Sequence, residues 1–407
     1  MFRKLHYHIN NYKFSIVSII ILLGTISLVL IQKLQDSDEN QFERQLYGLI
    51  FGFFVMFVVS LIDYHFIAKL YILLYLGNIV LMMICKYVTY SMFPLVYGWQ
   101  HFQARRWIKI GGGGRAGQGF EFMPSELTKI ILIVCVATIL VRVGERMNRF
   151  WYLAGILVFG MFPIFLVFDQ PDFSTSIVLI ATFLFMLYIG GLSYKIIVPG
   201  LLVGIPLVSF LFWYIQQPFQ KLLDPVWQQP RILSILHPER YPDLMYQQNN
   251  AAAAIESGGM FGKMIIGDDS FRLTNYVPVV ESDFIFCSVA EEFGFFGCLV
   301  VVGFFFLLTF IGFRIAMNAR DRLGYLIASG ISVAICLQTI VNIGVVVSLL
   351  PNTGIPLPFM SSGLSSLLTN MMTIGVLLNV GLQDKNTALE KEKYDMDLKV
   401  LLKDDLK

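Results

Sequence analysis

The sequence predicts an all-α polytopic membrane protein with about ten transmembrane helices. Hydrophobic residues make up 56% of its 407 residues, charged residues make up only 14%, and its mean hydropathy is +0.69. A water-soluble protein carries about 25% charged residues. The chain also contains repeated uncharged runs close to the ~20 residues that a helix needs to cross a bilayer. These observations exclude a soluble globular enzyme.

Ten apolar segments are predicted to span the membrane, and a large loop, residues 216–282, separates the seventh from the eighth. The eighth is too long for one simple crossing, so its first turns, with Glu291 and Glu292, are expected at the membrane interface. A basic stretch precedes the first segment without a cleavage site after it, which indicates an uncleaved anchor. The predicted spans are 14–32, 46–62, 68–88, 126–143, 151–167, 174–189, 196–215, 284–313, 323–348 and 364–381.

The distribution of basic residues predicts the orientation, because short cytoplasmic loops are enriched in Lys and Arg. With the N-terminus in the cytoplasm, alternate loops are basic, whereas the opposite loops at 36–40 and 168–172 are acidic. Residues 1–382 then form a single transmembrane domain with an extracytoplasmic loop at 216–282. The tail, 383–407, returns to the cytoplasm as an amphipathic helix on the membrane. The basic loop residues are Lys69, Arg142, Arg146, Arg149, Lys195, Arg314, Arg320 and Arg322.

Several classes of site find no support in the sequence. The five cysteines lack metal or disulfide spacing, which indicates buried small side chains. No histidine cluster is present, which argues against a zinc enzyme. Gly112, Gly114 and Gly117 fit a G-x-G-x-x-G pattern, but a dinucleotide site needs it between a strand and a helix, so a flexible loop is expected. Asp268 and Asp269 are expected in a turn or helix cap rather than at a metal.

A basic loop between the third and fourth spans lies on the predicted outer side and contains Arg105, Arg106, Lys109 and Arg115. Basic residues there act against the usual charge asymmetry of membrane proteins. One interpretation is that they are only solvated. The other, which we favour, is an anionic ligand, because the planar guanidinium group of Arg suits phosphate recognition. Trp107 follows directly and suits the headgroup level of a membrane.

The fourth span begins with Pro124, Glu126 and Lys129. Proline suits the first turn of a helix, and the two charged residues are neighbours on one helix face. An ion pair exposed at the membrane edge would contribute well under ~1 kcal/mol. A pair pointing into the bundle would instead form a polar site that has to be paired. The spacing leaves both interpretations open.

The remaining unusual polar features converge on the predicted outer side. Asp283 ends the large loop and opens the eighth span, and residues 351–366 are rich in Pro, Gly and Ser. Irregular backbone at membrane depth is tolerated where it is buried in protein or lines a cavity. We therefore expect this loop to cover one outer cavity together with Asp283, the basic loop and residues 170–172. The alternative for Asp283 is an N-cap on the helix that follows.

A series of co-linear motifs runs along the chain: ARRWI at 104–108, MPSELTK at 123–129, QPDFSTS at 170–176, AIESGGMFGK at 254–263, ESDFIF at 281–286, EEFGFFG at 291–297 and NTGIPLPFMSSG at 352–363. In this order and spacing they resemble the SEDS family (shape, elongation, division and sporulation), which includes RodA and FtsW. The resemblance covers about residues 14 to 382 and is closer to RodA. Met123, Glu281 and Ser282 depart from the usual family residues, but no departure removes an ionisable catalytic candidate.

The resemblance implies a peptidoglycan glycosyltransferase that polymerises lipid II at the bacterial inner (cytoplasmic) membrane. It implies Asp283 as the general base, and partial burial would raise its pKa above the ordinary value of about 3.9. A divalent cation, Mg²⁺ or Mn²⁺, is implied at the substrate diphosphate, with no ligand set identified. A class B penicillin-binding protein, a transpeptidase, is the implied partner besides membrane lipids. The implied substrate-binding residues are Arg105, Arg106, Trp107, Glu126, Lys129 and Ser361.

Two other functions stay open at this point. A flippase of the lipid-linked precursor would need alternating access, which broken spans at corresponding positions of two halves would favour. Pro163 interrupts the fifth span, but no convincing repeat is present. An inactive scaffold for a penicillin-binding protein would be favoured by loss of the acidic or basic candidates, and both are present.

Overall fold

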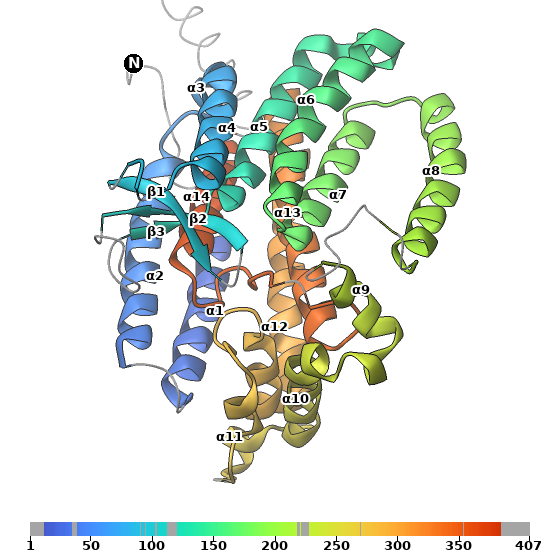
Figure 1. Cartoon of the computed structure of the whole chain (residues 1–407). Helices are drawn as coiled ribbons and strands as arrows, with labels where there is room; N and C mark the ends of the chain where they lie inside the picture. The colour runs from blue at the N-terminus through green and yellow to red at the C-terminus, as the bar shows by residue number, and fades with distance from the viewer. Residues whose placement is uncertain are drawn as a thin grey trace, which may run out of the picture.

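The computed structural model describes residues 12–34, 39–89, 91–93, 95–101, 104–111, 120–217, 220, 228–268, 270–352 and 354–383. Within these ranges ten apolar helices run through the molecule (Figure 1), eight of them long enough to cross a bilayer and two shorter. They confirm the predicted polytopic class. The helices are α1 (Phe14–Lys33), α2 (Glu39–Ser60), α4 (Tyr71–Tyr87), α5 (Pro124–Val143), α6 (Phe150–Asp169), α7 (Phe173–Ile189), α8 (Tyr194–Ile215), α12 (Ile285–Met317), α13 (Arg322–Val346) and α14 (Leu364–Leu382).

The observed helix ends agree with the predicted spans within a few residues, with one larger difference. The second helix begins at Glu39 rather than near residue 46, because the polar residues before Tyr47 continue the helix beyond the apolar run. Pro124 lies in the first turn of α5, as predicted. The predicted amphipathic tail, 383–407, lies outside the described residues except for its first residue.

The two ends of the bundle differ, and we name them the site face and the opposite face. The site face carries the loops that follow α4, α6 and α13 and the large insertion between α8 and α12. The opposite face carries short turns, including α3 (Tyr64–Lys69) and η3 (Gly144–Asn148). There Asn148 Nδ2 donates to Gly191 O at 3.1 Å, and Arg322 Nη2 donates to Gly190 O at 2.6 Å. Three of the short basic turns therefore meet at one end of the bundle.

Close backbone contact joins α2 to α14. A Cβ atom on Gly375 would lie 2.7 Å from the carbonyl oxygen of Met56, and one on Gly52 would lie 2.9 Å from Cγ of Met371. Small residues let membrane helices approach in this way. In contrast, α8 contains no buried residue and stands apart from the other helices in Figure 1. The packed part of the bundle is therefore built from the other helices.

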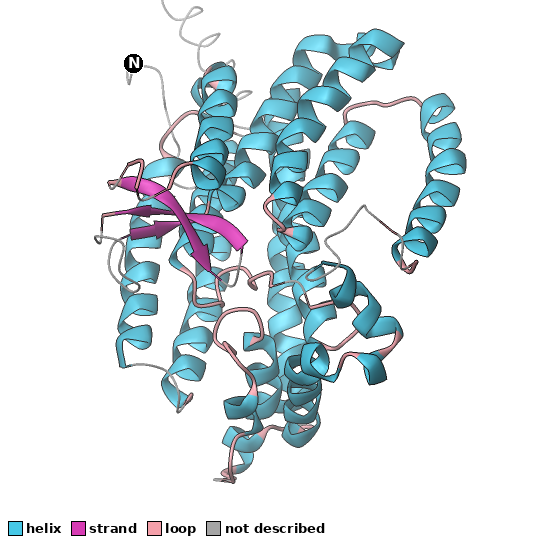
Figure 2. Cartoon of the chain, in the orientation of Figure 1, coloured by secondary structure: helices cyan, strands magenta, loops and turns pink. Residues whose placement is uncertain are grey.

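A three-stranded antiparallel sheet lies on the site face (Figure 2), and the sequence analysis did not predict it. Its strands are β1 (Val96–His101), β2 (Ala104–Ile110) and β3 (Phe120–Phe122), in that order. Aromatic and β-branched residues favour strands where a surface is present to pack against. The end of α4 supplies that surface, because Gly98 N donates to Val88 O at 2.8 Å and a Cβ on Gly98 would collide with Cys85 O. The predicted flexible glycine loop, 112–119, lies outside the described residues.

The insertion between α8 and α12 folds into short helices, and α12 itself is broken. At Gly294 the backbone angles are φ 67° and ψ −165°, so α12 consists of two helical segments that meet there. Asp268 Oδ1 accepts from Ser270 N at 2.9 Å, which confirms the predicted turn. The helices of the insertion are α9 (Gln228–Leu236), η4 (Pro238–Arg240), α10 (Pro242–Gly258), α11 (Lys263–Ile266) and η5 (Leu273–Tyr276).

Candidate active site

Asp283 lies on the site face, in the short turn that connects the insertion to α12. Its carboxylate accepts a hydrogen bond from Ser282 Oγ at 2.9 Å, and its backbone carbonyl accepts one from Asn342 Nδ2 of α13 at 2.8 Å. A Cβ atom on Gly354 would lie 3.0 Å from Asp283 Oδ2. Among the described residues, none forms an ion pair with this carboxylate. The backbone of Asp283 is therefore fixed, while its charge lacks a direct partner.

The structure shows that the helix-cap interpretation of Asp283 is wrong. The N-cap of α12 is Phe284, and no side chain caps that helix. Two other aspartates show what such a cap looks like here. Asp172 accepts from Thr175 N at 3.4 Å and caps α7, and Asp321 accepts from Gly324 N at 2.8 Å and caps α13. Because Asp283 accepts no such bond, its carboxylate is available for another role.

Arg106 of β2 reaches the turn between α6 and α7. Its Nε donates to Gln170 O at 3.2 Å, and its Nη2 donates to Pro171 O. The adjoining Asp172 accepts from Ser125 Oγ of α5 at 3.0 Å, so this turn is held by a third element. Both acceptors of Arg106 are neutral carbonyl groups, and no ion pair joins it to another described residue. Its positive charge is therefore available to an anion.

A second arginine, Arg231 of α9, lies near the first, and the sequence analysis missed it. Burial and the charge of Arg106 lower the pKa of Arg231, whereas the charge of Asp283 raises it. These mutual effects place the three groups within electrostatic range of one another. The side chain of Arg231 makes no hydrogen bond to another described residue, whereas its backbone carbonyl accepts one from Ser234 Oγ at 2.9 Å. Nothing in its proline-rich surroundings pointed to it, because that segment shows no periodicity and no motif.

Burial raises the pKa of Asp283, and the charges of Asp172 and Glu281 raise it further. The hydrogen bond from Ser282 and the charge of Arg106 act in the opposite direction and do not outweigh burial. Asp283 as a whole residue is half-buried, and protein surrounds its carboxyl group closely enough for desolvation to dominate. A carboxylate with a raised pKa accepts protons more readily than an ordinary one. The site thus combines a basic carboxylate with two cations that lack carboxylate partners.

Glu126 and Lys129 form a buried ion pair inside the bundle, with 2.7 Å between Glu126 Oε2 and Lys129 Nζ. They are only 1% and 5% exposed, so the interpretation as an exposed pair at the membrane edge is wrong and the paired polar site is confirmed. Lys129 Nζ also donates to Gln338 Oε1 of α13 at 2.7 Å, and Gln338 Nε2 donates to Pro356 O at 2.8 Å. The pair therefore braces the loop that lies against Asp283.

The loop at 351–366 folds over the Asp283 turn, as the sequence analysis expected. Asn342 Nδ2 donates to Ile355 O at 2.7 Å as well as to Asp283 O, and Ser362 N donates to Glu281 O at 2.7 Å. Ser361 is 3% exposed, and its Oγ accepts from Leu357 N at 2.7 Å. In this structure Ser361 therefore shapes the loop from within, and a contact with substrate stays a prediction.

Arg105 and Trp107 flank Arg106 on β2. Arg105 pairs in register with Gln100 of β1, and Trp107 pairs with Trp99. The side chain of Arg105 lies outside the described part of the structure. Trp107 is half-buried, and its carbonyl oxygen accepts a weak hydrogen bond from the thiol of Cys85 at 3.5 Å. The substrate-binding roles of both residues stay predictions.

Strained backbone is concentrated on the site face. In the described ranges, Val279 (φ 52°), Ser348 (60°) and Phe359 (65°) have positive φ, and all three lie on site-face loops. Such conformations cost on the order of 1–3 kcal/mol each and cluster at functional sites.

A divalent cation does not fit the protein residues by themselves. In the part of the chain that the structure describes, no three His, Cys, Asp or Glu side chains gather in a way that could hold a metal ion. The carboxylates of Asp172 and Glu281 lie within electrostatic range of Asp283. Both already accept hydrogen bonds from the protein: Asp172 from Ser125 Oγ, and Glu281 from Gln41 Nε2. The predicted Mg²⁺ or Mn²⁺ would depend on substrate oxygens and water for most of its ligands, and it stays a prediction.

Comparison with known proteins identifies the family. A protein named probable peptidoglycan glycosyltransferase FtsW from Geobacter sp. (strain M18) is 31% identical over 375 residues, which cover 91% of this chain and 94% of that protein. Stage V sporulation protein E of Bacillus subtilis (strain 168) is 32% identical over 377 residues, 90% of this chain and 95% of that protein. Both similarities extend over nearly the whole chain.

A solved structure described as "Structural coordination of polymerization and crosslinking by a peptidoglycan synthase complex" has the same fold. Its TM-score is 0.73 at 24% sequence identity, over 91% of this chain and 97% of that one. The family model for FtsW, RodA and SpoVE, described as "Cell cycle protein", matches residues 10–386. The chain therefore belongs to the FtsW/RodA/SpoVE family, the SEDS family that its motifs resemble.

Proposed function

We propose that this chain, a peptidoglycan glycosyltransferase of cell-wall synthesis, polymerises lipid II into glycan strands with Asp283 as its general base. The observation that carries the proposal is the combination of charges at the site. A carboxylate with a raised pKa and no ion pair lies within electrostatic range of Arg106 and Arg231, neither of which has a described carboxylate partner. The names of the relatives support the reaction class.

The two arginines suit the leaving group. In lipid II the bond that breaks joins the anomeric carbon of the donor sugar to an oxygen of undecaprenyl diphosphate, so negative charge develops on that diphosphate. Fixed positive charges in a site shielded from water stabilise such charge strongly. The guanidinium groups of Arg106 and Arg231 offer this charge, and their planar forks match pairs of phosphate oxygens.

Asp283 suits the nucleophile. A hydroxyl group of the acceptor sugar attacks the anomeric carbon, and its proton passes to the Asp283 carboxylate while the new C–O bond forms. The electron pair of the broken bond stays on the diphosphate. A single in-line displacement converts the α-linked donor into a β-linked product, so one base is sufficient. A positioned base of this kind contributes roughly 10²–10⁴-fold to the rate.

The proposed orientation places the site face outside the cytoplasm and the opposite face inside it, in a bacterial cytoplasmic membrane with both termini inside. Support comes from the basic turns that meet on the opposite face. Single cysteines at Ser270 and Arg146, both exposed, test this with a membrane-impermeant maleimide on intact cells. We expect labelling at position 270 only, and labelling at 146 alone would reverse the orientation.

A class B penicillin-binding protein is the proposed partner, because a protein of the same fold is described within a complex that coordinates polymerization with crosslinking. The branch of the family is a separate matter. The motifs favoured a RodA-like member, whereas the two relatives above carry the names FtsW and stage V sporulation protein E. Complementation of strains depleted of RodA or of FtsW separates elongation from division.

Purified protein supplied with labelled lipid II tests the proposed function. We expect glycan polymer in detergent from the wild-type chain and none above background from Asp283→Asn. Translocation of lipid II across vesicles without polymer would instead identify a flippase. Retention of a penicillin-binding protein with neither activity would identify a scaffold.

A further inference from the structure

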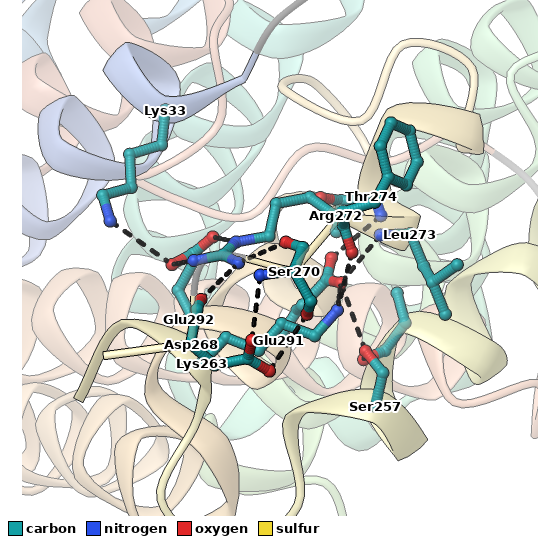
Figure 3. Close-up of polar contacts among 12 residues, drawn as sticks. Lys33, Ser257, Lys263, Asp268, Ser270, Arg272, Leu273, Thr274, Glu291 and Glu292 are labelled. Carbon is teal, nitrogen blue, oxygen red and sulfur yellow. Dashed lines mark hydrogen bonds and ion pairs between the residues drawn. The ribbon is translucent and has the colours of Figure 1, made fainter. Parts of the chain in front are cut away.

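Glu291 is a buried carboxylate at the start of α12 that the reaction does not use. It is 0% exposed. Its Oε1 accepts from Lys263 Nζ at 2.6 Å, Leu273 N at 2.7 Å and Ser257 Oγ at 3.2 Å, and its Oε2 accepts from Thr274 N at 2.9 Å (Figure 3). Two of these donors are consecutive backbone N–H groups of η5. The carboxylate thus fastens the insertion to α12 by its backbone.

The position of these bonds in the chain matters for Asp283. Thr274 precedes Asp283 by nine residues, and Glu291 follows it by eight. The Asp283 turn is therefore the tip of a chain loop whose two ends are tied together at Glu291. From Ile285 to Glu291 the chain is helical, so the segment between Glu291 and the Asp283 turn is rigid. A change in the position of η5 relative to Glu291 would therefore move Asp283.

Backbone packing holds the same junction from a second direction. Gly262, before α11, and Gly294, at the break in α12, have φ of 78° and 67° and meet so closely that a Cβ on either would lie 2.4 Å from the backbone of the other segment. Phe295 N donates to Gly259 O at 2.9 Å. The insertion and α12 therefore form one joined unit, and Glu291 is the charged group at its centre.

The neighbouring Glu292 provides a natural comparison. It is 4% exposed and binds only side chains: Arg272 Nε at 2.6 Å, and Lys33 Nζ at 3.7 Å. None of its hydrogen bonds reaches the backbone of η5. The two adjacent glutamates are thus alike in burial and in having a cationic partner. They differ in how they hold the loop that leads to Asp283: Glu291 binds the backbone of η5, whereas Glu292 binds only the side chain of Arg272, the residue before η5.

We propose that Glu291 is a positioning residue for the glycosyl transfer, which holds Asp283 in place by tying η5 to α12. The proposal rests on the function proposed above for Asp283. A buried carboxylate that satisfies two backbone donors and a lysine cannot be replaced by an amide of the same shape, because the amide lacks the charge for Lys263 and presents only one acceptor atom. Displacement of a catalytic group by about 1 Å costs about 10²-fold in rate.

The test compares Glu291→Gln with Glu292→Gln in lipid II polymerisation by purified full-length protein. For Glu291→Gln we expect kcat to fall about 10²-fold with KM nearly unchanged. We also expect the acid limb of its pH–rate profile to move to lower pH, because a loosened Asp283 gains water and its pKa falls. Glu292→Gln should keep kcat within a few-fold of wild type, and the acid limb of its pH–rate profile should stay at the wild-type position.

A second pair of variants leaves Glu291 itself unchanged. Arg272, before Leu273, has extended backbone (φ −86°, ψ 120°), the conformation preferred before proline. Leu273→Pro removes one N–H donor to Glu291 and places the proline Cδ where that N–H pointed, so the carboxylate has to move aside, while Leu273→Ala keeps the donor. We expect the acid limb of the pH–rate profile to move to lower pH in Leu273→Pro and to stay in place in Leu273→Ala.

The outcomes distinguish the positioning role of Glu291 from the assignment of Asp283 as the general base. Wild-type kcat and an unmoved limb in either Glu291→Gln or Leu273→Pro would overturn the positioning role, as would equal losses in Glu291→Gln and Glu292→Gln. An acid limb that persists in Asp283→Asn would instead overturn the assignment of Asp283 as base.

Discussion

Two charged clusters at opposite ends of the bundle are built on contrasting principles. On the site face, Asp283, Arg106 and Arg231 influence one another at a distance, yet no ion pair joins any of them to a described residue. On the opposite face, His65 lies between two carboxylates, with Nε2 2.6 Å from Asp321 Oδ2 and Nδ1 2.9 Å from Asp63 Oδ1. One cluster keeps its charges apart, and the other pairs them.

The pKa shifts follow this difference. The hydrogen bond that His65 donates to Asp321 raises the pKa of His65, and the hydrogen bond to Asp63 adds to the effect. Burial acts to raise the pKa of Asp63 and Asp321, but the hydrogen bonds that they accept outweigh it and lower both. Tyr64 Oη also donates to Asp321 Oδ1 at 2.9 Å, so both carboxylates of this cluster accept hydrogen bonds from side chains. Asp283 shows the reverse: burial raises its pKa, and the hydrogen bond from Ser282 and the charge of Arg106 do not outweigh that effect. The contrast teaches that the paired cluster stabilises the fold, whereas the unpaired one costs stability and is free to act on a substrate.

The largest expected effect concerns a buried pair next to the site. Lys129→Met leaves the Glu126 carboxylate buried without its cation, and we expect it to lower the free energy of unfolding by about 3–5 kcal/mol. The double variant Glu126→Gln with Lys129→Met removes both charges and should recover most of that loss. Denaturation of the purified variants in detergent measures the change in the free energy of unfolding. A loss below about 1 kcal/mol for the single variant would mean that this pair behaves as an exposed one.

The next effect is on turnover. Arg231→Ala, which breaks no described hydrogen bond, should lower kcat for lipid II about 10²-fold, the usual effect of removing one group that stabilises developing charge. Arg106→Ala should do the same and also release the turn at Gln170. Lysine at either position should rescue in part, since it keeps the charge and loses the fork. Wild-type turnover in the double Ala variant would show that both arginines are only solvated.

A smaller effect tests whether Asp283 costs stability. The folded-state pKa of Asp283 is raised, so the folded protein binds this proton more tightly than the unfolded chain does, and stability falls as pH rises through that pKa. Asp283→Asn should therefore be more stable than wild type at pH 7. The gain should shrink as wild type protonates at lower pH. If Asp283→Asn is less stable than wild type at pH 7, the charge of Asp283 stabilises the fold, as the charges of the paired cluster do.

The smallest expected effect is on the opposite face. The raised pKa of His65 gives a contribution that is complete below its ordinary pKa of about 6.5 and is lost as pH rises through the folded value. Because His65 is about a third exposed, His65→Gln should cost only about 0.5 kcal/mol at pH 6. It should cost less at pH 9, with no change in lipid II polymerisation. Loss of polymerisation in this variant would contradict the division of roles between the two clusters.

The sequence predicted the helices well because their signal is local, since each span is an apolar run bounded by charge or proline. It also brought Arg106, Asp283 and the loop at 351–366 to one face, because alternate loops of a polytopic protein share a side. The sheet escaped prediction, because strands such as Val96–His101 form against the end of α4, and that surface is known only from the fold.

Other parts of the site depended on contacts between distant segments. Arg231 comes from an irregular segment and reaches Asp283 only through the folding of the insertion. The cap interpretation of Asp283 followed from its place before a helix, and it was wrong because Phe284, not Asp283, occupies the cap position. Gln338 and Asn342, spaced four residues apart in an apolar span, did carry a signal, since polar residues in membrane helices face partners within the bundle.

The pH dependence of lipid II polymerisation by wild-type protein and Asp283→Asn, compared at matched thermal stability, tests the central claim most directly. The claim predicts that wild-type turnover falls at low pH with an apparent pKa above the ordinary aspartate value of about 3.9. It predicts that Asp283→Asn loses about 10²-fold or more and that its residual activity lacks this limb. Turnover of Asp283→Asn close to wild type, with the acid limb unchanged, would contradict the assignment of Asp283 as the general base.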